Sequence, residues 1–184
     1  MNKLILVNGD LATGKSHFAL ILKNRYQIPL YTKDEYKEAL ADETSCRTIQ
    51  DSHKLSLLAM EKIINIYKAT ATKHTDLILE ANFHEEHLNQ LLEIANEYGY
   101  EILNLNLVGT TTILYDRYMH RLKYEPRHKV HSFNTLNSFI KFKAYTENRR
   151  KEKLIGTVIT INTDDFSYQK DASLLERIDS FINN

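Results

Sequence analysis

The stretch Gly9-Asp10-Leu11-Ala12-Thr13-Gly14-Lys15-Ser16 decides the fold of this chain. It matches the pattern G-x-x-x-x-G-K-[ST], whose glycines let successive backbone N–H groups point inward at phosphate oxygens. Lys15 supplies positive charge to the β- and γ-phosphates of a nucleotide, and Ser16 offers its hydroxyl to the Mg²⁺ that bridges them. We therefore predict that this loop, with His17 directly after it, binds a nucleoside triphosphate and Mg²⁺.

The sequence on either side of the loop supplies the setting that this chemistry needs. The apolar run 4–7 predicts a buried strand before the loop, and residues 15–25 predict a helix after it, whose positive dipole end favours phosphate. Further strands are expected at 28–31, 77–79, 102–108 and 157–161, and further helices at 34–40, 52–71, 84–98, 111–122, 136–153 and 172–182. Apolar strands that alternate with helices favour a parallel sheet covered on both faces.

The bulk composition narrows the class of protein. A chain of 184 residues predicts one domain, 1–184, and its 24 Lys and Arg balance 24 Asp and Glu. A net charge of zero makes general nucleic-acid binding improbable without excluding it. Cys46 is the single cysteine, which fits a reducing compartment, and the run 4–7 is too short for a signal peptide or a membrane span. We expect a cytoplasmic protein without a membrane partner.

Three more motifs accompany the phosphate loop: Tyr31-Thr32-Lys33-Asp34, Leu77-Ile78-Leu79-Glu80 and Asp116-Arg117-Tyr118-Met119-His120-Arg121. With them the chain resembles the small P-loop kinases: shikimate and gluconate kinases, nucleoside monophosphate kinases, chloramphenicol phosphotransferase, zeta toxins and related kinase-like ATP-binding proteins. The resemblance covers most of the chain. It implies a three-layer α/β P-loop NTPase fold, with a five-stranded parallel sheet in the order 2-3-1-4-5, helices on both faces and a helical lid.

Asp34 has two interpretations that are compatible with each other. In similar kinases an acidic residue at this position accepts the proton of the substrate hydroxyl, and a carboxylate near the γ-phosphate can orient the attacking oxygen. The resemblance thus makes Asp34 both catalytic and substrate-binding. Asp is also a favoured N-cap, and a helix is expected to begin here.

Glu80 and Asn82 stand where the third predicted strand ends. Glu80 resembles the acidic residue of a Walker B strand, which holds Mg²⁺ or its water, although Asp is commoner there. Glu80 could instead be the base, orient substrate or merely end a strand, so the choice of base between Asp34 and Glu80 stays open. Asn82 is expected to contact substrate, because ligands bind at the carboxyl ends of strands in open α/β sheets.

The arginines from residue 117 onward predict a lid. Arg117 and Arg121 are four residues apart and share a helix face. The resemblance implies that Arg117 and Arg127 contact ATP, that Arg121 stabilises the transferred phosphoryl group, and that residues 122–134 or so close over the site and exclude water. The alternative is a solvated basic helix face.

The acceptor pocket is expected to include residues 42–51 with Arg47, and Asn162 and Thr163 are expected to border the adenine. The leading hypothesis is an ATP-dependent phosphotransferase that moves the γ-phosphate to a hydroxyl or phosphate of an unidentified small molecule or nucleotide, with ATP and Mg²⁺ as cofactors. A nucleotide-dependent regulatory or binding ATPase, and a kinase of nucleic-acid ends or of a sugar nucleotide, are the alternatives. Neither the acceptor nor the oligomeric state is readable from the sequence.

Overall fold

The computed structural model describes residues 1–133 and 136–183, so Asn134 at the end of the predicted lid, Thr135 and Asn184 lie outside the described part of the chain. In the described part the strands form one parallel sheet in the order β2-β3-β1-β4-β5. This order confirms the predicted topology. The strands are β1 (Asn2–Gly9), β2 (Leu30–Thr32), β3 (Leu77–Glu80), β4 (Tyr100–Val108) and β5 (Thr157–Asn162).

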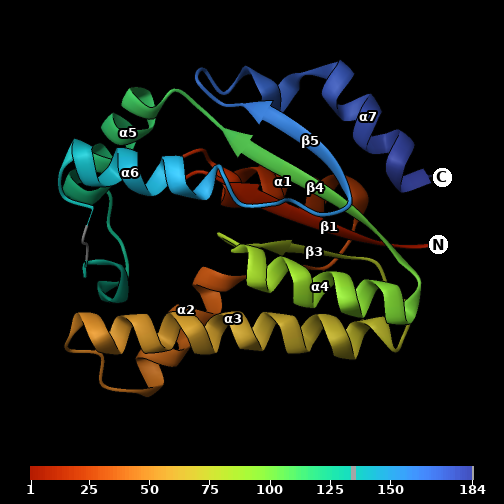
Figure 1. Ribbon diagram of the computed structural model, residues 1–184, viewed down its shortest axis with the longest axis horizontal. Helices are drawn as coiled ribbons and strands as arrows, with labels where there is room; N and C mark the ends of the chain where they lie inside the picture. The colour runs from red at the N-terminus through yellow and green to blue at the C-terminus, as the bar shows by residue number, and fades with distance from the viewer. Residues whose placement is uncertain (134–135, 184) are drawn as a thin grey trace.

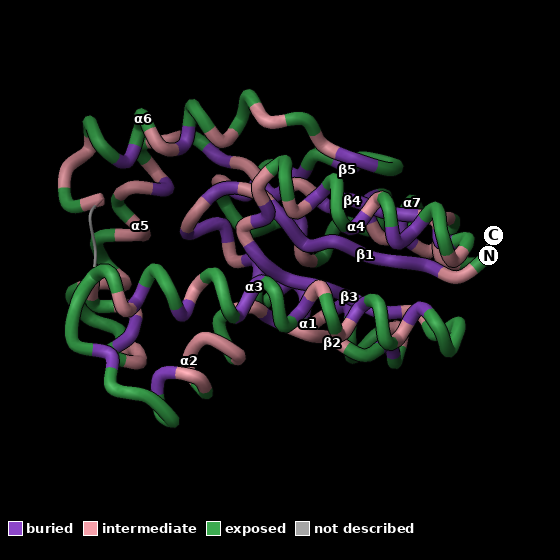
Figure 2. The backbone as a smooth tube through the Cα atoms, turned by 60° about the horizontal axis from the view of Figure 1, so that its bottom comes forward, coloured by how far each residue is buried: buried purple, intermediate pink, exposed green. Residues whose placement is uncertain are grey.

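Helices cover both faces of this sheet, which gives three layers (Figure 1). The helices α3 (Ile49–Ala71) and α4 (Glu85–Tyr98) bury Ile63, Tyr67 and Leu91 against Leu4 and Leu6 of β1. The helices α1 (Lys15–Tyr26) and α7 (Ala172–Asn183) pack on the opposite face, against the alternate side chains of the same strand. Figure 2 shows that β1 and β3 are buried along their length, as expected for central parallel strands.

Three helices lie around the carboxyl ends of the strands rather than over the sheet: α2 (Lys33–Glu43), α5 (Thr111–Tyr124) and α6 (Phe139–Arg149). The helices α5 and α6 lie side by side, because the ring of Phe142 packs 5.5 Å from that of Tyr115 and 5.2 Å from that of Tyr118. Between them the chain forms a 3₁₀ turn, η1 (Lys129–His131), which contacts α2. A second 3₁₀ turn, η2 (Ser167–Lys170), follows β5.

Two helix boundaries differ from the prediction for local reasons. The helix expected at 52–71 begins at Ile49, because Thr48 and Asp51 form a capping box that satisfies the first N–H groups. The helix expected at 136–153 is shorter: the Ser138 side chain caps its start by accepting from Lys141 N–H, and the helix ends at Arg149. Within the described residues, no helix is long and apolar enough to cross a membrane.

Candidate active site

The phosphate loop connects the end of β1 to the start of α1, and its glycines have backbone conformations that other residues adopt only with strain. Gly9 has φ 122°, and a Cβ atom there would lie 2.0 Å from the Leu107 carbonyl oxygen of the neighbouring strand. Gly14 has φ 86°, and a Cβ atom there would meet the rings of Phe166 and Tyr168. The loop is therefore enclosed by β4 on one side and by the segment after β5 on the other.

Lys15 is buried under this loop. Its Nζ donates to the carbonyl oxygens of Asp10 at 2.5 Å and Gly9 at 3.4 Å. Burial lowers the pKa of Lys15, while the nearby carboxylates of Glu80, Asp34 and Asp10 raise it. No carboxylate of the described residues forms an ion pair with this ammonium group within 4 Å, which suits the binding of phosphate.

Ser16 and Glu80 meet at the start of α1. Ser16 Oγ donates to Glu80 Oε2 at 3.1 Å, although the two residues are 64 positions apart. Burial raises the pKa of Glu80 to about 7, whereas Lys15 opposes that rise. A hydroxyl and a carboxylate side by side are oxygen ligands of the kind that Mg²⁺ prefers. No group of three or more His, Cys, Asp or Glu in the described residues forms a metal cage, so a metal here would draw its other ligands from phosphate and water.

Asp34 lies in the first turn of α2 and is exposed. It is not the N-cap, because Thr32 occupies that position and its Oγ1 accepts from Glu35 N–H. The interpretation of Asp34 as the cap is therefore wrong, since Thr32, one step before the helix, already fills that role. This arrangement leaves the Asp34 carboxylate available to the site.

One large cavity of about 890 Å³ brings these residues together. It has the size of a site for a drug-sized ligand or larger. The described residues that line it include most of the predicted site: Leu11, Ala12, Thr13, Gly14, Lys15, Ser16, His17, Lys33, Asp34, Glu80, Asn82, Asp116, Arg117, Arg121, Arg127, Phe166 and Gln169. The Oδ1 atom of Asn82 is buried and has no hydrogen-bond partner among the described residues, so it is free to accept from a ligand or a water in the cavity.

Five predicted site residues lie outside this lining: Gly9, Asp10, Arg47, Asn162 and Thr163. Asn162 Oδ1 accepts from Asp164 N–H, and the Thr163 carbonyl accepts from Arg117. Arg47 is exposed before α3, where its backbone N–H donates to Asp51. Gly9 and Asp10 instead line a second cavity of about 220 Å³ on the other side of the loop. The Asp10 carboxylate accepts from Arg150, with Oδ2 2.5 Å from Nη2, because this buried group requires a partner. Asp10 therefore contributes its backbone to the phosphate loop, while its side chain anchors the end of α6.

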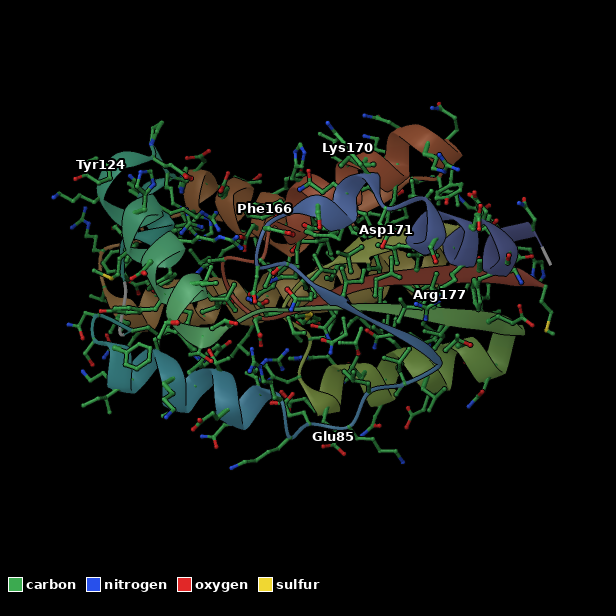
Figure 3. The ribbon with its side chains drawn as sticks, turned by 90° about the horizontal axis from the view of Figure 1, so that it is seen from above. Glu85, Tyr124, Phe166, Lys170, Asp171 and Arg177 are labelled. Atoms are coloured by element: carbon green, nitrogen blue, oxygen red, sulfur yellow. The ribbon has the colours of Figure 1, made fainter. Side chains whose placement is uncertain are left out.

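The segment after β5 forms one wall of the cavity beside the phosphate loop. Arg117 donates to the carbonyl oxygens of Thr163 and Asp164, and its guanidinium lies 3.9 Å from the centre of the Phe166 ring. Tyr168 Oη donates to the Thr13 carbonyl of the phosphate loop at 3.1 Å. Figure 3 shows Phe166 on the segment between β5 and α7, away from Tyr124 at the end of α5.

Sequence reasoning missed Phe166 and Tyr168. The signal available was indirect: an aromatic pair directly after the fifth strand. Only the contact with Gly14 and Thr13 identifies these rings as part of the loop's support, because 150 or so residues of chain separate them.

The predicted lid is in contact with α2 and α3. His131 Nε2 lies 2.8 Å from Glu38 Oε1, and His128 Nε2 lies 3.0 Å from Asp42 Oδ1. Val130 is buried, and its carbonyl oxygen accepts from Ser52 Oγ. These contacts hold the segment that carries Arg127 over the open side of the cavity. Arg121 also lines the cavity, and its Nε lies 3.4 Å from Glu125 Oε2.

No protein-family profile and no curated protein sequence matches this chain. Its structure is nonetheless similar to solved structures over its whole length. A protein of Chloroflexus aurantiacus described as a candidate kinase has a TM-score of 0.84 at 20% sequence identity, covering 98% of both chains. A sugar kinase of Janibacter has a TM-score of 0.64 at 14% identity, covering 100% of this chain and 95% of that chain. A gluconokinase of Sinorhizobium meliloti has a TM-score of 0.55 at 13% identity, covering 98% and 95%.

These similarities confirm the fold. The chain has the three-layer architecture of the P-loop kinases, with the strand order that the resemblance implied. At such identities the similarity carries no information about the acceptor.

Proposed function

We propose that this protein is an ATP-dependent phosphotransferase that moves the γ-phosphoryl group of ATP to a hydroxyl of a small molecule. One observation carries the proposal: the Lys15 ammonium, the Ser16–Glu80 pair and the Asp34 carboxylate all line the same cavity. Phosphoryl transfer needs a cation to offset phosphate charge, ligands for a metal ion and a carboxylate to take the proton, and these groups supply them in that order.

On the donor side, the backbone N–H groups from Leu11 to Ser16 and the Lys15 ammonium bind the phosphates of ATP. The Ser16 hydroxyl and the Glu80 carboxylate are the residues that would hold Mg²⁺, which offsets charge on the β- and γ-phosphates when bound. Arg117 and Phe166 flank the place of the adenine ring. Arg117 donates to the segment after β5, and its guanidinium lies over the Phe166 ring.

On the acceptor side, Asp34 is the better placed of the two candidate bases. Glu80 is buried and bonded to Ser16, whereas Asp34 is exposed to the cavity and has no ion-pair partner within 4 Å among the described residues. Asp34 accepts the proton of the acceptor hydroxyl while that oxygen bonds to the γ-phosphorus, and the bond from phosphorus to the bridging oxygen of ADP breaks. Arg121 stabilises the charge on the phosphoryl group as it transfers.

The test is phosphoryl transfer from ATP to a panel of metabolites, with wild-type protein and Asp34→Asn. We expect the variant to lose about 10²–10⁴-fold in kcat, the usual contribution of a positioned general base. Its KM for ATP should change little, because the phosphate loop is intact. Glu35→Gln is the matched control, since Glu35 is an exposed neighbour on the same helix that does not line the cavity.

Two outcomes would contradict this function. Full transfer activity in Asp34→Asn would remove Asp34 from the reaction. Hydrolysis of ATP without transfer to any acceptor, at equal rates in wild type and variant, would favour a nucleotide-dependent regulatory module instead.

A further inference from the structure

The acceptor end of the site carries three cations that lack an anionic partner. Lys33 and Lys37 belong to α2, and Arg127 belongs to the segment before η1. All three side chains are half-buried, and among the described residues none forms an ion pair within 4 Å. Arg121, which lines the same cavity as Lys33 and Arg127, is by contrast paired with Glu125.

These cations come from two elements that are in contact, α2 and the lid, and Arg127 lies close enough to Lys37 to lower its pKa. Lys33 and Lys37 are four residues apart, so they share a face of α2. The contacts of His131 with Glu38 and of His128 with Asp42 hold the lid segment on the same helix, and Arg127 directly precedes His128. The cations from the two elements therefore gather in one region.

Burial is the largest influence on the pKa of the two lysines, and the nearby carboxylates oppose it only in part. Burial lowers the pKa of both Lys33 and Lys37, and Arg127 lowers that of Lys37 further. Asp34 raises the pKa of both lysines, but it is the base that the proposed reaction uses. Glu38 is already engaged by His131. Burying a cation without an ion-pair partner costs desolvation free energy, and a bound anion would offset that cost.

The phosphate loop and Lys15 do not account for the whole of this cluster. Lys33 and Arg127 line the same cavity as the loop, whereas Lys37 does not line it and lies one turn further along α2. The cluster thus continues along α2 beyond Asp34, and that is where we place the acceptor.

We propose that the acceptor is an anion: besides the hydroxyl that is phosphorylated, it carries a phosphate or carboxylate group that binds between Lys33, Lys37 and Arg127. This inference rests on the proposed function, because it assigns chemistry to the acceptor half of the same site. The rest of the acceptor extends toward Asn82, whose buried Oδ1 lacks a partner among the described residues.

The first experiment compares acceptors that differ only in the anionic group: AMP with adenosine, glucose 6-phosphate with glucose, and gluconate with sorbitol. Transfer from ATP should be confined to anionic members, and the pair that reacts distinguishes phosphate from carboxylate. Lys37→Gln should lower kcat/KM for that acceptor at least tenfold, with the KM for ATP unchanged. A neutral compound that accepts phosphate better than its anionic counterpart would overturn the inference.

The second experiment does not depend on finding the acceptor. The protein is saturated with ADP and Mg²⁺ to fill the donor site, and the binding of methyl phosphate and of acetate is then measured by NMR titration. At least one probe should bind wild type and the control Lys62→Gln alike, since Lys62 is exposed on α3, and Lys37→Gln should weaken that binding severalfold. Absence of binding of both probes to the loaded wild type, or unchanged binding in Lys37→Gln, would refute the anion site.

The two experiments separate this inference from the proposed function. If a probe binds as expected but no acceptor of any kind is phosphorylated, the kinase function fails while the anion site stands. If a neutral compound is phosphorylated and neither probe binds, the kinase function stands and the anionic acceptor is wrong.

Discussion

At the scale of single residues, Gly9 shows how closely the phosphate loop depends on its neighbour strand. Its positive φ and the position of the Leu107 carbonyl leave no room for a side chain. The N–H of Asp10 donates to that same carbonyl at 2.8 Å, so the strand also fixes the direction in which the loop leaves β1. The glycine is thus required by packing as well as by the approach of phosphate.

We expect Gly9→Ala to lower the free energy of unfolding by more than about 2 kcal/mol, because left-handed strain and a backbone clash add together. Gly99→Ala is the matched control. Gly99 also has positive φ, at 70°, but nothing lies within 4 Å of its Cβ position, so only strain of about 1 kcal/mol applies. Urea denaturation measures both variants. Equal stabilities would show that the Leu107 carbonyl yields to the new methyl group.

At the scale of elements, α6 is tied to the back of the phosphate loop. Arg149 Nη2 donates to Asn8 Oδ1 at 3.3 Å, and Arg150 binds the Asp10 carboxylate and the Gly109 carbonyl oxygen. The helix thereby connects the lid region to the ends of β1 and β4. Arg149 and Arg150 therefore fix the phosphate loop from the side of the second, smaller cavity.

We expect Arg150→Ala to lower the free energy of unfolding by about 1–3 kcal/mol. The Asp10 side chain is only 3% exposed and would remain buried without its cation. The double variant with Asp10→Asn should recover part of that loss, since the buried charge is then absent. Lys151→Ala, at an exposed neighbouring position, serves as the control. Chemical denaturation would refute the assignment if the double variant were no more stable than Arg150→Ala alone.

At the scale of the whole molecule, the parallel topology assembles the site. The pairing of β1 with β3 places Val7 opposite Glu80, so both strands end at the same edge of the sheet. Ser16 and Glu80 then meet, while β2 brings Asp34 to the same edge through Thr32, which pairs with Glu80. Binding of nucleotide should therefore stabilise the entire domain, because the residues proposed to bind it belong to several elements.

We expect Mg²⁺ and ATP at 100 times the dissociation constant to add about 2.7 kcal/mol of stability, or a rise in Tm of roughly 5–10 °C for a domain of this size. Lys15→Met should lose most of this rise, because it removes the ammonium that binds phosphate. Thermal unfolding monitored by circular dichroism measures the shift. A Tm that does not change with ATP in the wild type would contradict nucleotide binding at the loop.

The sequence by itself predicted the phosphate loop and the elements on either side of it. The fixed spacing from Gly9 to Ser16, the apolar strand before it and the helix after it specify a phosphate site through local chemistry alone. The strand order followed from resemblance to the P-loop kinases, and the described structure confirms it.

Only the tertiary structure decided what surrounds that loop. Thr32 takes the cap that Asp34 was also suited to fill, the Asp10 side chain turns to Arg150, and Arg47 stays outside the cavity. Phe166 and Tyr168 reach the phosphate loop, and Lys33 and Arg127 line one cavity, from segments far apart in the chain. Such contacts depend on which strands are neighbours and how helices pack, and no local pattern of residues encodes them.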